Sequence, residues 1–66
     1  MKAWIARDLN GQVYLYTIEK PERVKSMGCW ENDYGSSEIE DCDIPKGIDP
    51  QWEDEPIEVE LIITKI

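Results

Sequence analysis

The sequence predicts a mainly β fold: a small antiparallel sheet of three to five strands in one domain of 66 residues. Two observations predict it. Apolar residues occupy every second position near the C-terminus, which is the period of a strand. Near the N-terminus, two alternating segments flank the turn-forming sequence Asp8-Leu9-Asn10-Gly11. We expect strands at about residues 2–7, 12–18, 27–31, 37–41 and 56–66, with a long irregular acidic loop at 42–55.

The last predicted strand, residues 56–66, is the clearest in the chain. Alternate residues from Ile57 to Ile63 are aliphatic and β-branched residues dominate, which favours a pleated and partly buried surface. Its other face is acidic at the start and apolar at the end, from Ile62 onward. Apolar character on both faces favours a central position in the sheet over an edge.

The first two strands are predicted to form a hairpin in which Asp8 lies opposite Gln12 and Gly11 adopts a left-handed conformation. This register gives one aliphatic face and one aromatic face. A two-residue Asn-Gly turn would mix the two classes, so the first register is preferred. The aliphatic face then consists of Ile5, Val13 and Leu15, and the aromatic face of Trp4, Tyr14 and Tyr16.

The aromatic face needs a cover, because large apolar patches are rarely left bare on monomers. The preferred cover is the long middle segment; the alternative is a second subunit or a protein partner. In that segment, residues 21–25 are predicted as a loop or single turn, and Gly28 weakens the third strand. Within the acidic loop, prolines exclude regular structure, and Ile44, Ile48 and Trp52 are the expected anchors.

Charge is unevenly placed along the chain, whose net charge is −8. Residues 1–30 carry five basic and three acidic residues, whereas residues 31–66 carry two basic and twelve acidic residues. This acidity argues against direct nucleic-acid binding and against an anionic membrane surface, both of which require Lys and Arg. It permits a basic protein partner.

The residues for most catalytic sites are missing from the sequence. Without His there is no Ser-His or Cys-His pair and no common zinc site, and no glycine-rich loop could hold a phosphate. No cofactor or metal is therefore predicted. The N-terminus lacks the pattern of a signal peptide, so we expect a cytoplasmic protein in which Cys29 and Cys42 are free thiols.

Several motifs at the two ends of the chain form a moderately specific set. They are Ile5-Ala6-Arg7-Asp8, Gly11, Tyr14-Leu15-Tyr16, Lys20-Pro21 and Trp52-Glu53-Asp54-Glu55-Pro56 with Glu58-Val59-Glu60-Leu61. Together they resemble a group of small proteins, without an assigned activity, that are encoded by gut bacteria and their phages. The resemblance implies a phage or mobile-element setting and carries over no functional residues.

The leading hypothesis for function is a small acidic, non-enzymatic protein that binds or modulates another protein, or self-associates. One alternative is a nucleic-acid mimic that inhibits a basic nucleic-acid-binding protein. Another is a small enzyme that uses Cys29 or a carboxylate pair. The predicted partner-binding residues are aromatic residues of the hairpin and an acidic run in the loop: Trp4, Tyr14, Tyr16, Glu53, Asp54 and Glu55.

Overall fold

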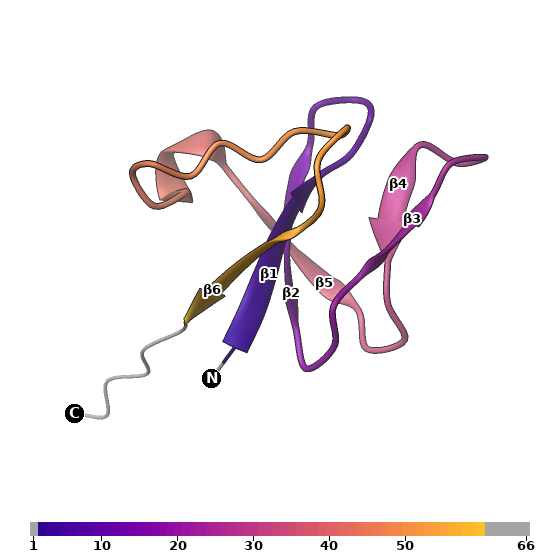
Figure 1. Ribbon diagram of the computed structural model, residues 1–66, viewed down its shortest axis with the longest axis horizontal. Coiled ribbons are helices and arrows are strands. Elements are labelled where there is room, and N and C mark those ends of the chain that lie inside the picture. Colours follow the sequence, from indigo (N-terminus) through magenta and orange to yellow (C-terminus); the bar gives the residue numbers. More distant parts are fainter. Residues whose placement is uncertain (1, 61–66) are drawn as a thin grey trace.

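The computed structural model of the chain describes residues 2–60 and is mainly β, as predicted (Figure 1). Within this range, no helix is long and apolar enough to cross a membrane. The only helical turn there is a 3-10 helix, η1. In chain order the elements are β1 (Lys2–Arg7), β2 (Val13–Thr17), β3 (Glu22–Val24), β4 (Cys29–Glu31), β5 (Ser36–Ile39), η1 (Asp41–Asp43) and β6 (Ile57–Glu60).

Four strands form an antiparallel sheet in the order β5-β2-β1-β6, and β3 and β4 form a separate two-stranded sheet. The prediction of a central position for the C-terminal strand is wrong for its described part, because β6 pairs with β1 alone and ends the sheet. The apolar residues on both faces that led to this prediction lie in 61–66, outside the described residues. The aliphatic row does continue across the sheet, since Ile57 lies opposite Ile5.

The predicted register of the β1–β2 hairpin is confirmed. Trp4 lies opposite Tyr16, and Ile5 lies opposite Leu15. The Asp8 amide donates to the Gln12 carbonyl at 2.8 Å, and the Gly11 amide donates to the Asp8 carbonyl at 2.9 Å. Gly11 has a φ of 95°, a region that glycine enters without a steric penalty. The turn and its alternating flanks therefore determine this hairpin locally.

The middle of the chain differs from the prediction. Residues 21–25 were expected to be a loop or single turn, but they contain β3, which pairs with β4 through Val24 and Cys29. Gly28 does not interrupt a strand: it ends the turn at 25–28 with a φ of 67°. The third and fourth predicted strands are accordingly shorter or shifted, because β4 begins at Cys29 and β5 ends at Ile39.

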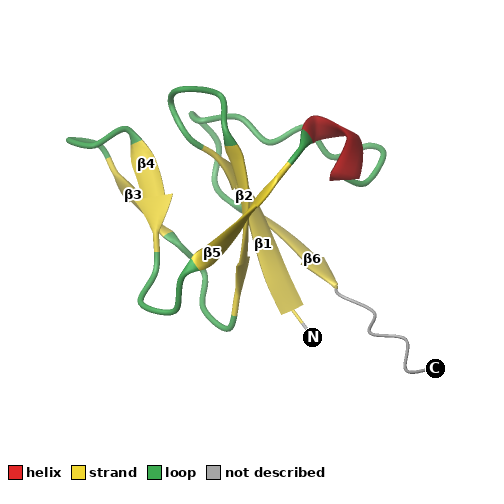
Figure 2. Ribbon diagram, turned by 180° about the vertical axis from the view of Figure 1, so that it is seen from behind, coloured by secondary structure: helices red, strands yellow, loops and turns green. Residues whose placement is uncertain are grey.

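The β3–β4 hairpin stands beside the four-stranded sheet, and the acidic loop crosses from β5 back to β6 (Figures 1 and 2). The main cluster of buried side chains consists of Ala6, Tyr16 and Trp30, so it lies on the aromatic face. The aliphatic face also holds fully buried residues, including Ile5 and Val13. The sheet thus buries side chains on both faces.

Candidate functional site

The aromatic face is covered by the middle of the chain, as the preferred interpretation predicted. Trp30 of β4 packs on Tyr16, and Trp52 of the acidic loop packs against the same cluster. Tyr16 is only 2% exposed, whereas Trp4 and Tyr14 are partly buried. Tyr16 is therefore unavailable to a partner in this fold, and the face acts mainly as a core.

Trp30 is fixed by three hydrogen bonds to the first hairpin. Its indole Nε1 donates to the Arg7 carbonyl at 3.0 Å, and its backbone amide donates to Asp8 Oδ1 at 3.2 Å. Its carbonyl oxygen accepts from the Tyr16 hydroxyl at 2.9 Å. Burial raises the pKa of Asp8, and the hydrogen bond from the Trp30 amide opposes that rise. These contacts attach the small sheet to the large one.

Arg23 of β3 connects the small sheet to the acidic loop. Its guanidinium carbon lies 4.7 Å from the centroid of the Trp30 ring and 5.2 Å from that of Trp52, within cation–π range. Its Nη2 donates to the backbone carbonyls of Trp52 and Asp54 at 2.9 and 3.1 Å. Its buried Nε has no hydrogen-bond partner within residues 2–60. Arg23 therefore fixes the backbone from which the acidic run extends.

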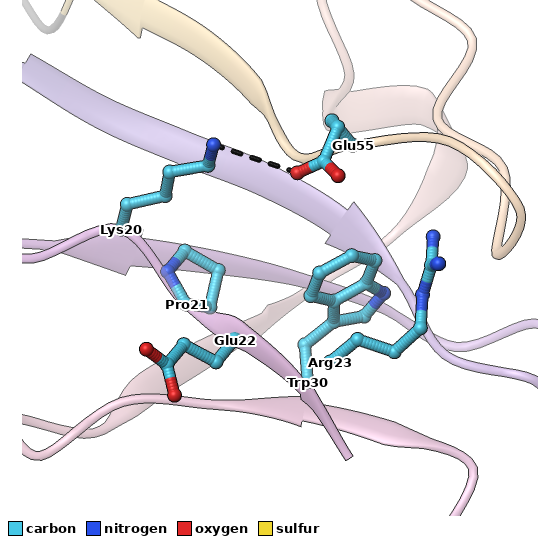
Figure 3. Close-up of a pocket in the computed structure, with 6 residues that line it drawn as sticks. All are labelled: Lys20, Pro21, Glu22, Arg23, Trp30 and Glu55. Atoms are coloured by element: carbon cyan, nitrogen blue, oxygen red, sulfur yellow. Dashed lines mark ion pairs between the residues drawn. The ribbon is translucent and has the colours of Figure 1, made fainter. Parts of the chain in front are cut away.

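Glu53, Asp54 and Glu55, which make up the acidic run, are all exposed. Glu55 forms an ion pair with Lys20 at 3.4 Å, across a shallow cleft of about 370 Å³ (Figure 3). The cleft is lined by Lys20, Pro21, Glu22, Arg23, Trp30 and Glu55. The charged side chains of this lining carry both signs of charge, and the lining includes no thiol or hydroxyl group.

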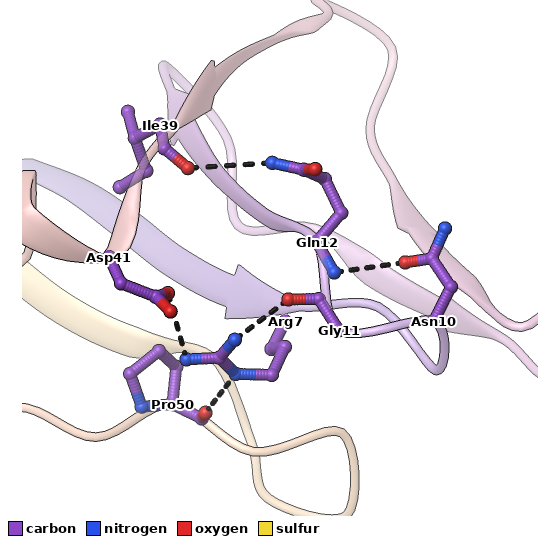
Figure 4. A network of polar contacts seen from close by, with 7 residues as sticks. All are labelled: Arg7, Asn10, Gly11, Gln12, Ile39, Asp41 and Pro50. Atoms are coloured by element: carbon purple, nitrogen blue, oxygen red, sulfur yellow. Dashed lines mark hydrogen bonds and ion pairs between the residues drawn. The ribbon is translucent and has the colours of Figure 1, made fainter.

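A second acidic region lies where β5 meets η1, and the site prediction did not include it. A hollow of about 320 Å³ is lined there by Glu38, Glu40 and Asp41 together with Gly11, Gln12, Val13 and Ile39. Arg7 borders it and holds three segments in place (Figure 4). Its Nε donates to the Pro50 carbonyl at 2.8 Å, its Nη1 donates to the Gly11 carbonyl at 2.7 Å, and its Nη2 lies 3.4 Å from Asp41 Oδ1.

Both cysteines are free thiols, as predicted. Burial is the main cause that raises the pKa of Cys29, and the nearby carboxylates of Asp8 and Glu31 raise it further. This environment disfavours the thiolate, which is the nucleophilic form. Cys42 is exposed, with its Sγ 3.7 Å from a carboxylate oxygen of Glu40. Residues 2–60 contain no cluster of three or more ligands that could hold a metal ion.

No protein-family model matches the chain, and no curated protein or solved structure is significantly similar to it. The candidate site therefore rests on geometry alone. The structure brings the three aromatic residues together with Trp30 and Trp52, and it leaves the acidic run outside that core. Sequence reasoning missed the role of Arg23. The one available signal was an arginine within a short segment after Pro21 in an acidic protein.

Proposed function

We propose that the protein is a small non-enzymatic module that binds a basic segment of another protein through its acidic surface. One observation carries the proposal: all twelve acidic residues that follow Trp30 have exposed side chains. Lys and Arg side chains of residues 2–60 form ion pairs with three of them, namely Asp41, Glu55 and Glu58. Such an excess of exposed carboxylates attracts a basic partner and accelerates its association.

The fold supports a division between the two sets of predicted partner-binding residues. The aromatic set, Trp4, Tyr14 and Tyr16, is engaged in packing. The acidic run projects from a backbone that Arg23 holds in place, so its carboxylates are presented at little cost in loop entropy. We therefore assign the contact with a partner to the acidic residues, and we assign the stability of the module to the aromatic ones.

Two alternatives receive less support. Nucleic-acid mimicry requires carboxylates spaced along one surface like phosphates, and the exposure of the acids does not by itself supply such a spacing. Catalysis through Cys29 is disfavoured by the raised pKa of its thiol. The cytoplasmic location and the phage setting stay predictions from the sequence.

The proposal is tested by affinity capture from lysates of gut bacteria, the setting that the sequence resemblance implies. The native protein is compared with the triple variant Glu53→Gln/Asp54→Asn/Glu55→Gln. A control, Glu19→Gln/Glu22→Gln, removes two exposed carboxylates that precede Trp30 and so lie outside the acidic second half of the chain. We expect a basic protein to be retained by the native protein and the control, to be lost from the triple variant, and to elute as salt rises. Equal retention by all three proteins in high salt would contradict the proposal.

A further inference from the structure

β5 forms an open edge of the four-stranded sheet. Ser36, Ser37, Glu38 and Ile39 pair with β2 on one side, and no strand of residues 2–60 pairs with the other side (Figure 2). The side chains of Ser36, Ser37 and Glu38 are exposed. Such an edge presents backbone donors and acceptors to which an extended chain can add as a further strand.

The register identifies which backbone groups of β5 point outward. Asp8 and Gln12 are joined by a backbone hydrogen bond, and hydrogen-bonded pairs alternate along an antiparallel ladder. Tyr14 and Tyr16 therefore direct their backbone groups to β1, while Val13 and Leu15 direct theirs to β5. Since Leu15 lies opposite Ser37 and Val13 opposite Ile39, the amides and carbonyls of Ser36 and Glu38 face away from the sheet.

The charge around this edge selects the incoming strand. Glu38 forms no ion pair with a Lys or Arg of residues 2–60, and beyond it the chain continues into the hollow bordered by Glu40 and Asp41. At the opposite edge, by contrast, Glu58 of β6 is already paired with Lys2 at 3.9 Å. A second copy of the chain would bring another row of carboxylates to β5, and like charges across a pairing are destabilising.

We propose that an extended basic segment of a partner protein adds to β5 as a fifth strand of this sheet. Its backbone pairs with the outward groups of Ser36 and Glu38, and its Lys or Arg side chains pair with Glu38 and reach the hollow beside Glu40 and Asp41. This inference rests on the proposed function and specifies how a basic partner is held, by main-chain pairing as well as by charge.

The test uses the full chain and a six-residue peptide that alternates Lys and Val. A second peptide carries N-methyl groups on alternate amides, which removes edge pairing without changing the charge. We expect the first peptide to slow hydrogen exchange at the amides of Ser36 and Glu38, and the methylated peptide to leave this exchange unchanged. Equal binding of both peptides, or protection only around residues 53–55, would overturn strand addition.

Two variants separate charge from pairing at one position. Glu38→Gln keeps the outward amide and should weaken binding of the Lys-Val peptide by about two- to fivefold, the range for one cross-strand charge pair. Glu38→Pro also removes that amide and should abolish binding, while the inward pairs of β5 keep the fold intact, as its melting temperature would show. If the acidic-run variant loses the basic partner while both Glu38 variants bind the Lys-Val peptide as the native protein does, strand addition is refuted and the proposed function is not. Absence of any basic partner would refute both proposals.

Discussion

The hydroxyl of Tyr16 donates a hydrogen bond of 2.9 Å to the backbone carbonyl oxygen of Trp30. The two residues lie on different sheets, β2 and β4, and their side chains are 2% and 5% exposed. A buried carbonyl in the middle of a three-residue strand thus obtains its partner from the neighbouring sheet. Because each sheet alone is small, this bond and the packing around it couple them into one folding unit.

Tyr16→Phe should therefore destabilise the protein although the aromatic ring is retained. The substitution leaves the Trp30 carbonyl buried without its donor, which typically costs about 1–3 kcal/mol. Urea unfolding followed by tryptophan fluorescence measures this loss. Tyr34→Phe is the matched control, since Tyr34 is 59% exposed and should give an unchanged midpoint. An unchanged urea midpoint for Tyr16→Phe would mean that a water molecule donates to the Trp30 carbonyl in place of the hydroxyl.

The same residue should make the protein sensitive to alkaline pH. Burial, with a smaller contribution from the Asp8 carboxylate, raises the pKa of Tyr16 from 10.0 to about 12. The folded protein holds this proton more tightly than the unfolded chain, so the corresponding stability is complete below pH 10 and is lost between pH 10 and about 12. As pH rises across this range, the unfolding free energy should fall less steeply for Tyr16→Phe than for the protein that keeps Tyr16. Both proteins should carry Cys29→Ser, which removes from the comparison the thiol whose pKa is also raised by burial.

The local parts of the fold were predictable from the sequence. The β1–β2 register follows from the turn at Asp8 and Gly11 and from the separation of aliphatic and aromatic residues. The small sheet was not predictable in the same way. β3 has three residues, too few to show a period, and it is stabilised by contacts distant in sequence, such as that between Arg23 and Trp52. Tertiary packing overrides weak local preference there.

The candidate site was partly predictable for a related reason. Exposure of Glu53, Asp54 and Glu55 follows from their charge, and the sequence predicts it correctly. The aromatic face is covered by Trp30 and Trp52, which lie far along the chain. The period-two pattern of apolar residues within a strand does not show which distant residues will pack on that strand. The open edge at β5 likewise depends on the order of the strands in the sheet, a long-range property.

Ile18 is strained, and relieving that strain should stabilise the protein. It has a φ of 73°, and the Glu19 amide donates to the Thr17 carbonyl at 2.8 Å across it, the pattern of a γ-turn. A positive φ is costly for a β-branched residue, and the side chain is 67% exposed, so little burial is lost on its removal. Ile18→Gly should raise the unfolding free energy by about 0.5–1 kcal/mol.

Met27→Gly is the control for Ile18→Gly. Met27 is 70% exposed and has no positive φ, so glycine there should only increase the entropy of the unfolded chain and lower stability. Thermal melts of the two variants should move in opposite directions. A decrease for both would show that the turn at Ile18 is not under strain in solution.

Arg23→Lys should loosen the acidic run although the charge is kept. Lysine cannot present a planar guanidinium to the Trp30 and Trp52 rings while it also donates to the two carbonyls that Nη2 now reaches. We expect a loss of about 1–3 kcal/mol in unfolding free energy. Hydrogen exchange should also accelerate at Asp54, whose amide donates to the Gln51 carbonyl at 3.2 Å. Lys25→Arg, at an exposed position on the next turn, should change neither quantity. If exchange at Asp54 stayed slow in Arg23→Lys, the run would be held by Lys20 and Glu55 instead.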